Sequence, residues 1–325
     1  MMRAILCSEF KGADALTVGQ APDPVPAPDE VLIDVRAAAV SFMDKLMAEG
    51  GYQMRPDLPY VPGTDAAGIV RAVGEEVTDF APGDRVVGQM WFGSYAERAV
   101  TKHWKCAKIP DGVDFAPAST VLHNYMTAYH ALIDRCNLQP GETLLVTGAT
   151  GGVGLAAVDM GRMLGARVIA ATGDEAKAEV LRDMGADAVV NTRNDGLRDK
   201  IKSLTNGKGI DVCFDMVGGD MFEQLARLMA WGGRITPIGF VSGKIPSLPM
   251  NLPLLKGFSV VGVFEGAWAE AFPGEARAAA DKIMNWVASG ELRPRIDRTL
   301  PLEQAPEALR ALDRREVIGR IVLEV

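Results

Sequence analysis

The sequence predicts an α/β fold in which a doubly wound parallel sheet of six strands follows a mostly β-rich domain. A glycine cluster stands where one strand should pass into a helix, and strand-like and helix-like runs alternate after about residue 117. Short β-like runs fill the chain before about residue 110. At 325 residues the chain also exceeds the usual size of a single hydrophobic core, so we expect two domains.

The first 110 residues predict a β-rich domain, a small irregular barrel. Proline occupies every second position from Pro22 to Pro28, which excludes a helix and predicts an extended connection. Gly-Asp and Pro-Gly pairs separate the strand-like runs. These runs are RAILC, EVLIDVRAAAV, GIVRAVG, GDRVVGQ and SYAERAV.

Beyond residue 117 the pattern changes to alternating strands and helices. A helix-like stretch runs from Ala118 to Arg135, and another from Glu275 to Ala288. Between them, apolar strands bounded by Gly and Asp predict the six-stranded sheet. The strand-like runs are TLLVTG, RVIAAT, AVVN, IDVCFDM, RITPIG and SVVGVF, with helices expected at 153–164, 175–184, 196–204 and 220–229. The last residues end in a strand, so we expect the C-terminal tail to return to the first domain.

The glycine cluster is the segment VTGATGGVGLAA, residues 146–157, at the end of the first strand of this sheet. Glycine costs about 0.5–1 kcal/mol relative to alanine in regular structure, so four of them need a reason. After a strand and before a helix they form a dinucleotide-binding turn, although Ala149 holds the first position of G-x-G-x-x-G. Gly151 allows the turn and the approach of a pyrophosphate, and Gly154 allows close packing of the helix.

Composition excludes several classes of protein. A formal charge of −8 argues against a nucleic-acid partner, which needs a basic face. We expect neither a signal peptide nor a membrane span, because no run of 18 apolar residues occurs. Four scattered cysteines without a C-x-x-C pair favour free thiols and a cytoplasmic protein.

At this point the sequence resembles a known family. GATGGVG follows LQPGETLLVT, and PGTDAAGIVRAVGEEVTDFAPGDRVVG lies upstream; NYMTAYHAL, GADAVVNTR, FDMVGGD and GRIVLEV come in the expected order. Over essentially the whole chain these motifs resemble the zinc-free quinone oxidoreductase (zeta-crystallin-like) branch of the medium-chain dehydrogenases and reductases. The resemblance implies a GroES-like catalytic domain, 1–123 with 268–325, and a Rossmann domain, 124–267. It also implies NADPH-dependent reduction of quinones or related conjugated carbonyls.

The resemblance also allows a prediction about metal binding. Relatives that oxidise alcohols hold catalytic zinc with Cys, His and Cys, and this chain has Ser41 and Thr64 at the first two positions. The four-cysteine lobe for structural zinc is missing, and His103, His123 and His130 are not spaced with cysteines as ligands. We therefore expect no metal. Alcohol oxidation needs a Lewis acid, whereas a quinone spreads the incoming negative charge over its own conjugated system.

The resemblance places Ser41, Asp44 and Tyr52 near the nicotinamide as candidate catalytic residues. Most relatives carry Asn in place of Ser41. Tyr52 could donate a hydrogen bond to the substrate oxygen, or it packs as a loop residue on the barrel. Asp44 has the alternative of holding the local backbone.

Cofactor-binding residues follow from the resemblance and from the strand ends. Thr127 is expected beside the cofactor, Gly152 and Val153 offer backbone N–H groups, and Arg320 in GRIVLEV reaches the phosphates. Phe240 and Phe264 follow the fifth and sixth strands, where ligands bind in such sheets, and core packing is the alternative for both. For Arg320 the alternative is a solvated surface position. The expected set is Thr127, Gly148, Gly151, Gly152, Val153, Gly154, Thr172, Lys177, Arg193, Phe240, Phe264 and Arg320.

The cofactor's 2′ position is harder to predict. The second strand of the sheet ends at Thr172, where an NAD enzyme would place an acid, and this favours NADP. Lys177 aligns with the lysine that relatives aim at the 2′-phosphate, and Arg193 could assist. Asp174 stands where relatives often have serine, and it could pair with Lys177 or bind the ribose of NAD. We expect NADPH.

Three functional hypotheses remain. The first is an NADPH:quinone reductase. The second is a reductase of 2-enones, 2-alkenals or enoyl thioesters, and the third is a non-catalytic NADPH-binding or RNA-binding protein. In each enzymatic case the partner is a small molecule, and the apolar run SVVGVF at the sheet edge predicts a homodimer.

Overall fold

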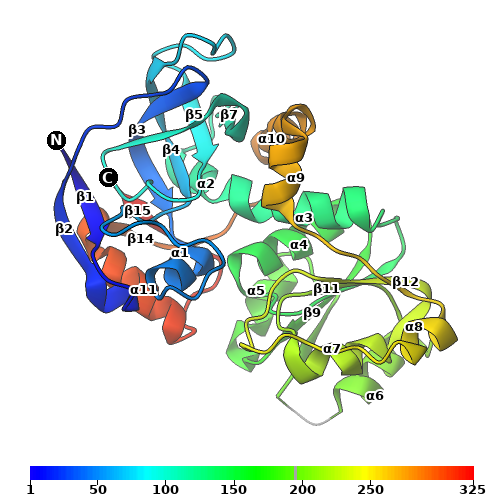
Figure 1. The fold of residues 1–325 in the computed structure, drawn as a ribbon. Helices are drawn as coiled ribbons and strands as arrows, with labels where there is room; N and C mark the ends of the chain where they lie inside the picture. Colours follow the sequence, from blue (N-terminus) through cyan, green and yellow to red (C-terminus); the bar gives the residue numbers. More distant parts are fainter. Residues whose placement is uncertain (194–195) are drawn as a thin grey trace. The chain divides into compact units, whose positions relative to one another are not determined.

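The computed structural model describes residues 1–193 and 196–325 and confirms the mixed α/β fold. The chain divides into two compact units. Unit 1 comprises Met1–His123 and Trp268–Val325, and unit 2 comprises Asn124–Ala267 (Figure 1).

Unit 1 is built on a seven-stranded sheet and a separate two-stranded sheet. The larger sheet has the order β14-β15-β3-β4-β5-β7, with β6 also paired to β3, and the smaller one is the antiparallel pair β1-β2. The strands are β1 Met2–Cys7, β2 Leu16–Ala21, β3 Glu30–Ala39, β4 Asp65–Val73, β5 Arg85–Gln89, β6 Arg98–Lys102, β7 Cys106–Lys108, β14 Ile296–Pro301 and β15 Arg320–Glu324.

The C-terminal strand β15 belongs to the sheet of unit 1. It pairs antiparallel with β3, with Val322 opposite Ala39, and parallel with β14. The tail therefore completes a sheet begun by the first forty residues of the chain.

Several short helices accompany this sheet, and the sequence pattern predicted only one of them. Proline at the first turn of α10 suits a helix start, so this helix begins at Pro273 rather than Glu275. In α11, the buried residues Ala305, Ala308 and Leu309 recur at helical spacing. The helices are α1 Phe42–Ala48, α2 Phe115–Ser119, α9 Glu265–Ala271, α10 Pro273–Ala288 and α11 Ala305–Asp313, with the short turns η1 Gly12–Ala15, η2 His103–Lys105 and η6 Leu302–Gln304.

Unit 2 contains the predicted parallel sheet of six strands, in the order β10-β9-β8-β11-β12-β13. This is the doubly wound arrangement, in which the strand order reverses between β8 and β11. The strands are β8 Thr143–Val146, β9 Arg167–Thr172, β10 Ala188–Asn191, β11 Ile210–Asp215, β12 Met229–Pro237 and β13 Ser259–Val260.

Helices cover both faces of this sheet because successive strand residues point to opposite sides. Leu145, Ile169 and Ile235 pack against α6, α7 and α8, which Figure 1 shows together on one side of the strands. Leu144 and Val168 contact Gly161 of α4 on the other side. The helices are α3 Thr127–Tyr129, α4 Gly152–Met163, α5 Ala178–Asp183, α6 Leu197–Leu204, α7 Gly219–Ala226 and α8 Asn251–Lys256, and η5 spans Glu175–Lys177.

Three boundaries differ from the sequence prediction. The sixth strand is confined to Ser259–Val260 because it pairs only with Arg234 and Ile235 of β12. The fifth strand begins at Met229, so α7 ends at Ala226 rather than at residue 229. The helix expected from Ala118 to Arg135 is divided, since π-helical turns η3 Leu122–Met126 and η4 His130–Arg135 flank α3.

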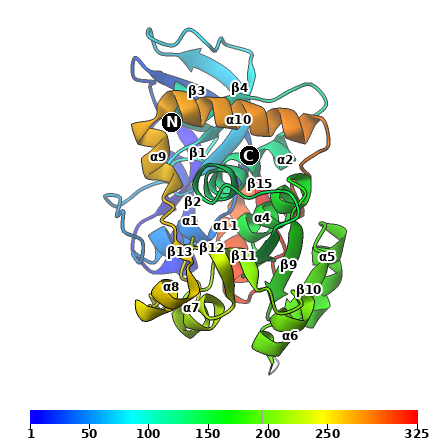
Figure 2. The same cartoon turned by 90° about the vertical axis from the view of Figure 1, so that its right-hand side faces the viewer.

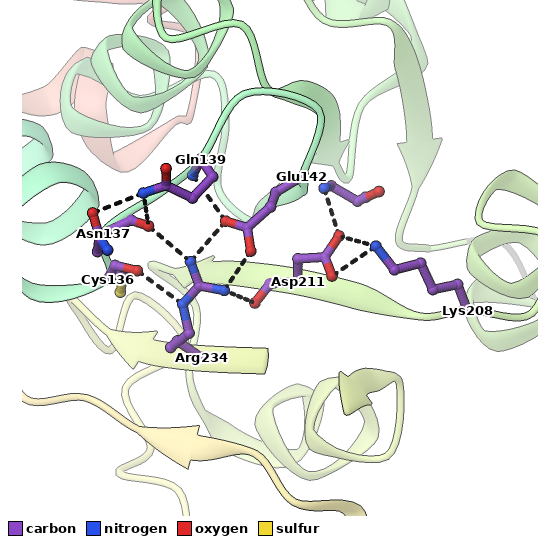
Figure 3. Close-up of polar contacts among 8 residues, drawn as sticks. Cys136, Asn137, Gln139, Glu142, Lys208, Asp211 and Arg234 are labelled. Atoms are coloured by element: carbon purple, nitrogen blue, oxygen red, sulfur yellow. Dashed lines mark hydrogen bonds and ion pairs between the residues drawn. The ribbon is translucent and has the colours of Figure 1, made fainter. Parts of the chain in front are cut away.

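A polar network ties together the amino ends of the central strands of unit 2 (Figure 3). Arg234 donates to both carboxylate oxygens of Glu142, at 2.8 and 2.7 Å, and to the carbonyls of Cys136 and Asn137. Beside it, the carboxylate of Asp211 accepts a 2.8 Å hydrogen bond from the Thr143 amide and binds Lys208. Hydrogen bonds from Arg234 hold the pKa of Glu142 below its ordinary value. The side chains at the amino ends of these strands are therefore engaged in hydrogen bonds and ion pairs with one another. The glycine turn lies at the opposite, carboxyl ends of the strands.

Candidate cofactor and active site

The glycine turn connects β8 to α4, as expected. Gly148 has a φ of +59°, a conformation that favours glycine, and a Cβ there would lie 3.0 Å from Cβ of Met216. The Gly151 amide donates a 3.2 Å hydrogen bond back to the Gly148 carbonyl, which closes the turn. The turn is therefore fixed against the neighbouring strand end.

Two glycines of the turn differ in their surroundings. A Cβ on Gly154 would lie 2.4 Å from the Gly148 carbonyl oxygen, so only glycine lets α4 begin this close to the turn. A Cβ on Gly151 would meet only one atom, at 3.6 Å, which leaves the backbone open on that side. The first amides of the 12-residue helix α4, including those of Gly152 and Val153, are donors suited to an anion.

Asp174 has a local structural role at the end of β9. The Asp174 amide donates to the hydroxyl of Thr172 at 3.2 Å, and Oδ1 of Asp174 accepts from the Ala176 amide at 3.0 Å. Asp174 is thus the N-cap of η5, a local role that its carboxylate performs through one oxygen. Serine, found here in relatives, is an equally good cap.

Two cationic side chains lie on the segments that follow this strand end. Lys177 closes η5. The exposed Arg193 folds over Gly173, where a Cβ would lie 3.2 Å from Nε of the arginine. No ion pair joins the Arg193 guanidinium to another of the described residues. Both residues lie on segments next to the end of β9, and their contact with a 2′-phosphate stays a prediction.

Phe240 and Phe264 follow the fifth and sixth strands and are both exposed, at 43% and 52%. Core packing, the alternative to a ligand contact, is therefore wrong for both. Phe240 lies against the turn after β11, since a Cβ on Gly218 would approach its ring to 2.9 Å. Thr127 begins α3 and is partly exposed.

In unit 1, Ser41 and Asp44 form the first turn of α1. The Asp44 amide donates to Oγ of Ser41 at 3.0 Å, and Oδ2 of Asp44 accepts from the Ser41 amide at 2.6 Å. This reciprocal capping box shows that Asp44 does hold the local backbone. The hydroxyl of Tyr95 also donates to Asp44, at 2.8 Å, and all three residues are buried.

Thr64 and Asp65 lie beside this cap, at the start of β4. The Thr64 hydroxyl is 3.4 Å from Oγ of Ser41 and 3.2 Å from Oδ2 of Asp65. Burial raises the pKa of Asp65 to about 7, and the Asp44 carboxyl adds to the shift. Burial also raises the pKa of Asp44.

Arg320 lies in this cluster. Nη1 donates a 2.8 Å hydrogen bond to the carbonyl of Val40, and Nη2 lies 3.4 Å from Oδ2 of Asp65. Arg320 is only 4% exposed, so the solvated surface position is wrong. Both terminal nitrogens are engaged within unit 1, whereas Nε is buried without a hydrogen-bond partner among the described residues. The expected contact with cofactor phosphates stays a prediction.

The remaining candidate catalytic residue is Tyr52. Tyr52 lies half-buried in the loop after α1. Across the described ranges 1–193 and 196–325, no three His, Cys, Asp or Glu side chains form a group that could hold a metal ion. Within the same ranges, no helix is long and apolar enough to cross a membrane.

Comparisons with known proteins agree with this geometry. Residues 27–111 match the alcohol dehydrogenase GroES-like domain, and residues 152–282 match the family described as zinc-binding dehydrogenase. The chain is 37% identical to the mouse quinone oxidoreductase-like protein 2 over 325 residues, covering 99% of this chain and 92% of the relative. The chain belongs to the quinone oxidoreductase family of medium-chain dehydrogenases and reductases.

Solved structures of similar proteins carry a dinucleotide. The quinone oxidoreductase of Escherichia coli, solved with NADPH, has a TM-score of 0.92 and 28% identity, covering 99% of this chain and 100% of that one. A mycobacterial protein complexed with NADPH also has a TM-score of 0.92, with 29% identity and full coverage of both chains. These likenesses confirm the Rossmann and GroES-like architecture of the quinone oxidoreductase family.

Sequence reasoning missed three buried polar residues: Asp65, Tyr95 and Asp215. Asp215 stands at the end of β11, where an acid directly after an apolar run is a recognisable signal. The pattern S-x-x-D at Ser41 could likewise have identified the capping box. Nothing local marks Tyr95, because its partner lies 51 residues away.

Proposed function

We propose that this chain is an NADPH-dependent reductase that transfers hydride to a quinone without a metal ion. The observation that carries this proposal is the pair of hydroxyls of Ser41 and Thr64, 3.4 Å apart, at the positions where alcohol-oxidising relatives hold zinc. Both hydroxyls are engaged in hydrogen bonds with neutral or acidic partners of the chain itself.

NADPH is the proposed cofactor. The open backbone at Gly151, the amides that begin α4 and the cations Lys177 and Arg193 support binding of a phosphorylated dinucleotide. Asp174 caps η5 with one carboxylate oxygen, which gives the acid a local role that does not depend on the ribose of NAD. NADPH complexes of the similar E. coli and mycobacterial proteins support the same choice.

The chemistry proposed for the residues follows from the lack of a Lewis acid among them. When bound, NADPH supplies the hydride. The hydroxyl of Tyr52 is proposed to donate a hydrogen bond to the acceptor oxygen. The buried pair Ser41 and Asp44 is proposed to fix the first turn of α1 through the capping box. A conjugated acceptor needs no stronger stabilisation of its oxygen, so positioning accounts for most of the catalysis.

An acceptor screen tests this function. Purified protein is mixed with NADPH or NADH and with quinones, 2-enones, 2-alkenals, an enoyl thioester or primary alcohols with oxidised cofactor, and nicotinamide absorbance is followed. We expect turnover with small quinones and none with alcohols. Preferential reduction of enones or thioesters would favour the second hypothesis, whereas NADPH binding without turnover of any acceptor would favour a non-catalytic protein.

The active molecule is proposed to be a homodimer joined through the β13 edge of unit 2. β13 ends the strand order, and Figure 2 shows it with α8 at one end of the sheet. Trp231 and Leu254 near this edge are 81% and 79% exposed, which is unusual for large apolar side chains. A second copy would pair the open edge and cover these side chains.

A cytoplasmic location is proposed from the cysteines. All four are free and buried. This suits a reducing compartment.

A further inference from the structure

Asp215 is a buried acid at the carboxyl end of β11, beside the point where the strand order of the sheet reverses. Both of its carboxylate oxygens are used. Oδ1 accepts from the Thr147 hydroxyl and, at 3.1 Å, from the Val217 amide, while Oδ2 accepts from the Gly218 amide at 3.0 Å. The acid thus fixes the turn that leads into α7.

Thr147 is the matching residue at the end of β8, directly before the glycine turn. Its hydroxyl donates to Asp215 and accepts a 2.9 Å hydrogen bond from the Met216 amide. The Thr147 amide donates to the Phe214 carbonyl at 3.0 Å. Three hydrogen bonds therefore join the two strand ends on either side of the reversal, where doubly wound sheets bind their ligands.

The turn after Asp215 carries this connection to a third segment, residues 238–244. The Ile238 amide donates to the Asp215 carbonyl at 2.8 Å, and the amides of Val241 and Ser242 donate to the carbonyls of Met216 and Val217 at 3.1 and 3.0 Å. This segment contains Phe240, so the glycine turn and Phe240 are fixed to one another through residues 215–217.

We propose that Asp215, through Thr147 and the turn 215–218, is a positioning residue for the dinucleotide. It holds the glycine turn and the Phe240 segment in the relative positions that the bound cofactor requires. Asp215 does not contact the cofactor in this proposal, which rests on the proposed binding of NADPH. Its three donors, the Thr147 hydroxyl and the amides of Val217 and Gly218, all belong to the chain itself.

Asparagine, which has the same shape as aspartate, could not make the hydrogen bonds of Asp215. Asn at position 215 offers one oxygen for three donors, and its NH₂ group would face either the Thr147 hydroxyl and the Val217 amide or the Gly218 amide. Burial raises the pKa of Asp215, and the three donors oppose this rise by stabilising the anion. The turn therefore needs the carboxylate rather than a neutral side chain of the same shape.

The test measures the Kd of NADPH directly, by fluorescence titration of the whole protein, together with the midpoint of thermal unfolding. We expect Asp215→Asn and Thr147→Val each to raise this Kd about tenfold or more, as expected for a charge-assisted hydrogen bond. Thr147→Ser, which keeps the hydroxyl, should retain an affinity close to that of the wild type.

The chain offers a matched control on the same strand. Asp211, at the amino end of β11, accepts from the Thr143 amide and binds Lys208 (Figure 3). Asp211→Asn should lower the unfolding midpoint and leave the Kd of NADPH unchanged within about twofold. Equal losses of affinity in Asp211→Asn and Asp215→Asn would show a merely structural role and overturn the proposal.

The remaining outcomes are also decisive. If Asp215→Asn does not fold, Thr147→Val and Thr147→Ser give the answer by themselves, and equal affinity in those two variants overturns the positioning role. If the wild type binds NADPH and all variants retain its affinity, only the positioning role fails. If the wild type itself binds no NADPH, the proposed function fails, and the positioning role fails with it.

Discussion

Arg320 donates a 2.8 Å hydrogen bond from Nη1 to the carbonyl of Val40, the residue that precedes Ser41. Its other terminal nitrogen reaches Asp65, the residue that follows Thr64. One guanidinium on the last strand of the chain therefore holds both segments that carry the hydroxyl pair. This explains why a cation is buried here: it balances an acid and positions two loops.

The first prediction concerns Arg320→Lys. An ammonium keeps the charge but cannot reach Val40 and Asp65 in the planar geometry of a guanidinium. We expect a loss of about 1–3 kcal/mol in the free energy of unfolding, measured by urea denaturation. The Kd of NADPH should change little. A large rise of that Kd at unchanged stability would instead support the phosphate contact expected from the family resemblance.

The second prediction is a pH dependence caused by Asp65. Burial raises its pKa to about 7, above the value of about 3.9 for an exposed aspartate. Between these values the folded protein holds a proton that the unfolded chain has released, so the free energy of unfolding falls as pH rises from about 4 to 7. Above pH 7 this contribution is constant.

The variant Asp65→Asn isolates this contribution. It cannot ionise, so its stability relative to the wild type should increase with pH by at most about 1.4 kcal/mol per unit up to pH 7. The pKa of His123, lowered to about 3 by burial, acts in the opposite sense, and the comparison with the wild type cancels it. Parallel stability profiles of the two proteins from pH 5 to 8 would contradict the prediction.

The third prediction concerns cofactor choice. Lys177→Ala and Arg193→Ala should each raise the KM for NADPH about tenfold to a hundredfold, because each removes a charge-assisted contact with the 2′-phosphate. The KM for NADH should change much less. Asp174→Ser preserves the cap of η5 and removes a negative charge, so it should shift the preference further toward NADPH.

Steady-state kinetics with both cofactors decides the matter. A wild type that prefers NADH, together with equal weakening of both cofactors in Lys177→Ala, would identify Asp174 as the ribose-binding acid. An unchanged selectivity in Arg193→Ala would remove that residue from the phosphate site.

The fourth prediction is independence from zinc. With Ser41 and Thr64 at the ligand positions, the purified protein should contain no stoichiometric zinc by elemental analysis and should keep its activity in a chelator. About one zinc per chain, with activity lost on its removal and restored by its return, would refute the proposed mechanism.

The fifth prediction concerns assembly. Light scattering at micromolar concentration should give the mass of a dimer for the wild type. Trp231→Glu places a charge on the exposed apolar surface beside Gly257 and should produce monomers, whereas Trp104→Glu, in unit 1, should not. A monomeric wild type would rule out the β13 interface.

Much of unit 2 follows from local sequence signals. The glycine turn and the alternation of apolar runs predict six strands, and the sheet of unit 2 contains all six. The exact extent of the sixth strand does not follow, because β13 has only β12 as a neighbour and its length depends on that pairing. Short helices such as α8 have too few residues to show a period.

The candidate site of unit 1 was less accessible to prediction. Ser41 and Asp44 lie within one turn, so their contact could be inferred from sequence spacing. Asp65 and Arg320 are 255 residues apart, and no local pattern indicates that they meet. Their contact depends on the pairing of β15 with β3, which is a property of the complete fold.

That pairing has a consequence for how the protein is made. Strand β3 is synthesised roughly 280 residues before β15, the strand that pairs with its edge. At about 5–20 residues per second this separation corresponds to a delay on the order of tens of seconds. Unit 2 is one continuous segment and can fold during that interval, whereas unit 1 must wait for residues 268–325. We therefore expect the nascent N-terminal half to carry an unpaired strand edge and an uncompensated buried acid, and to depend on chaperones until translation ends.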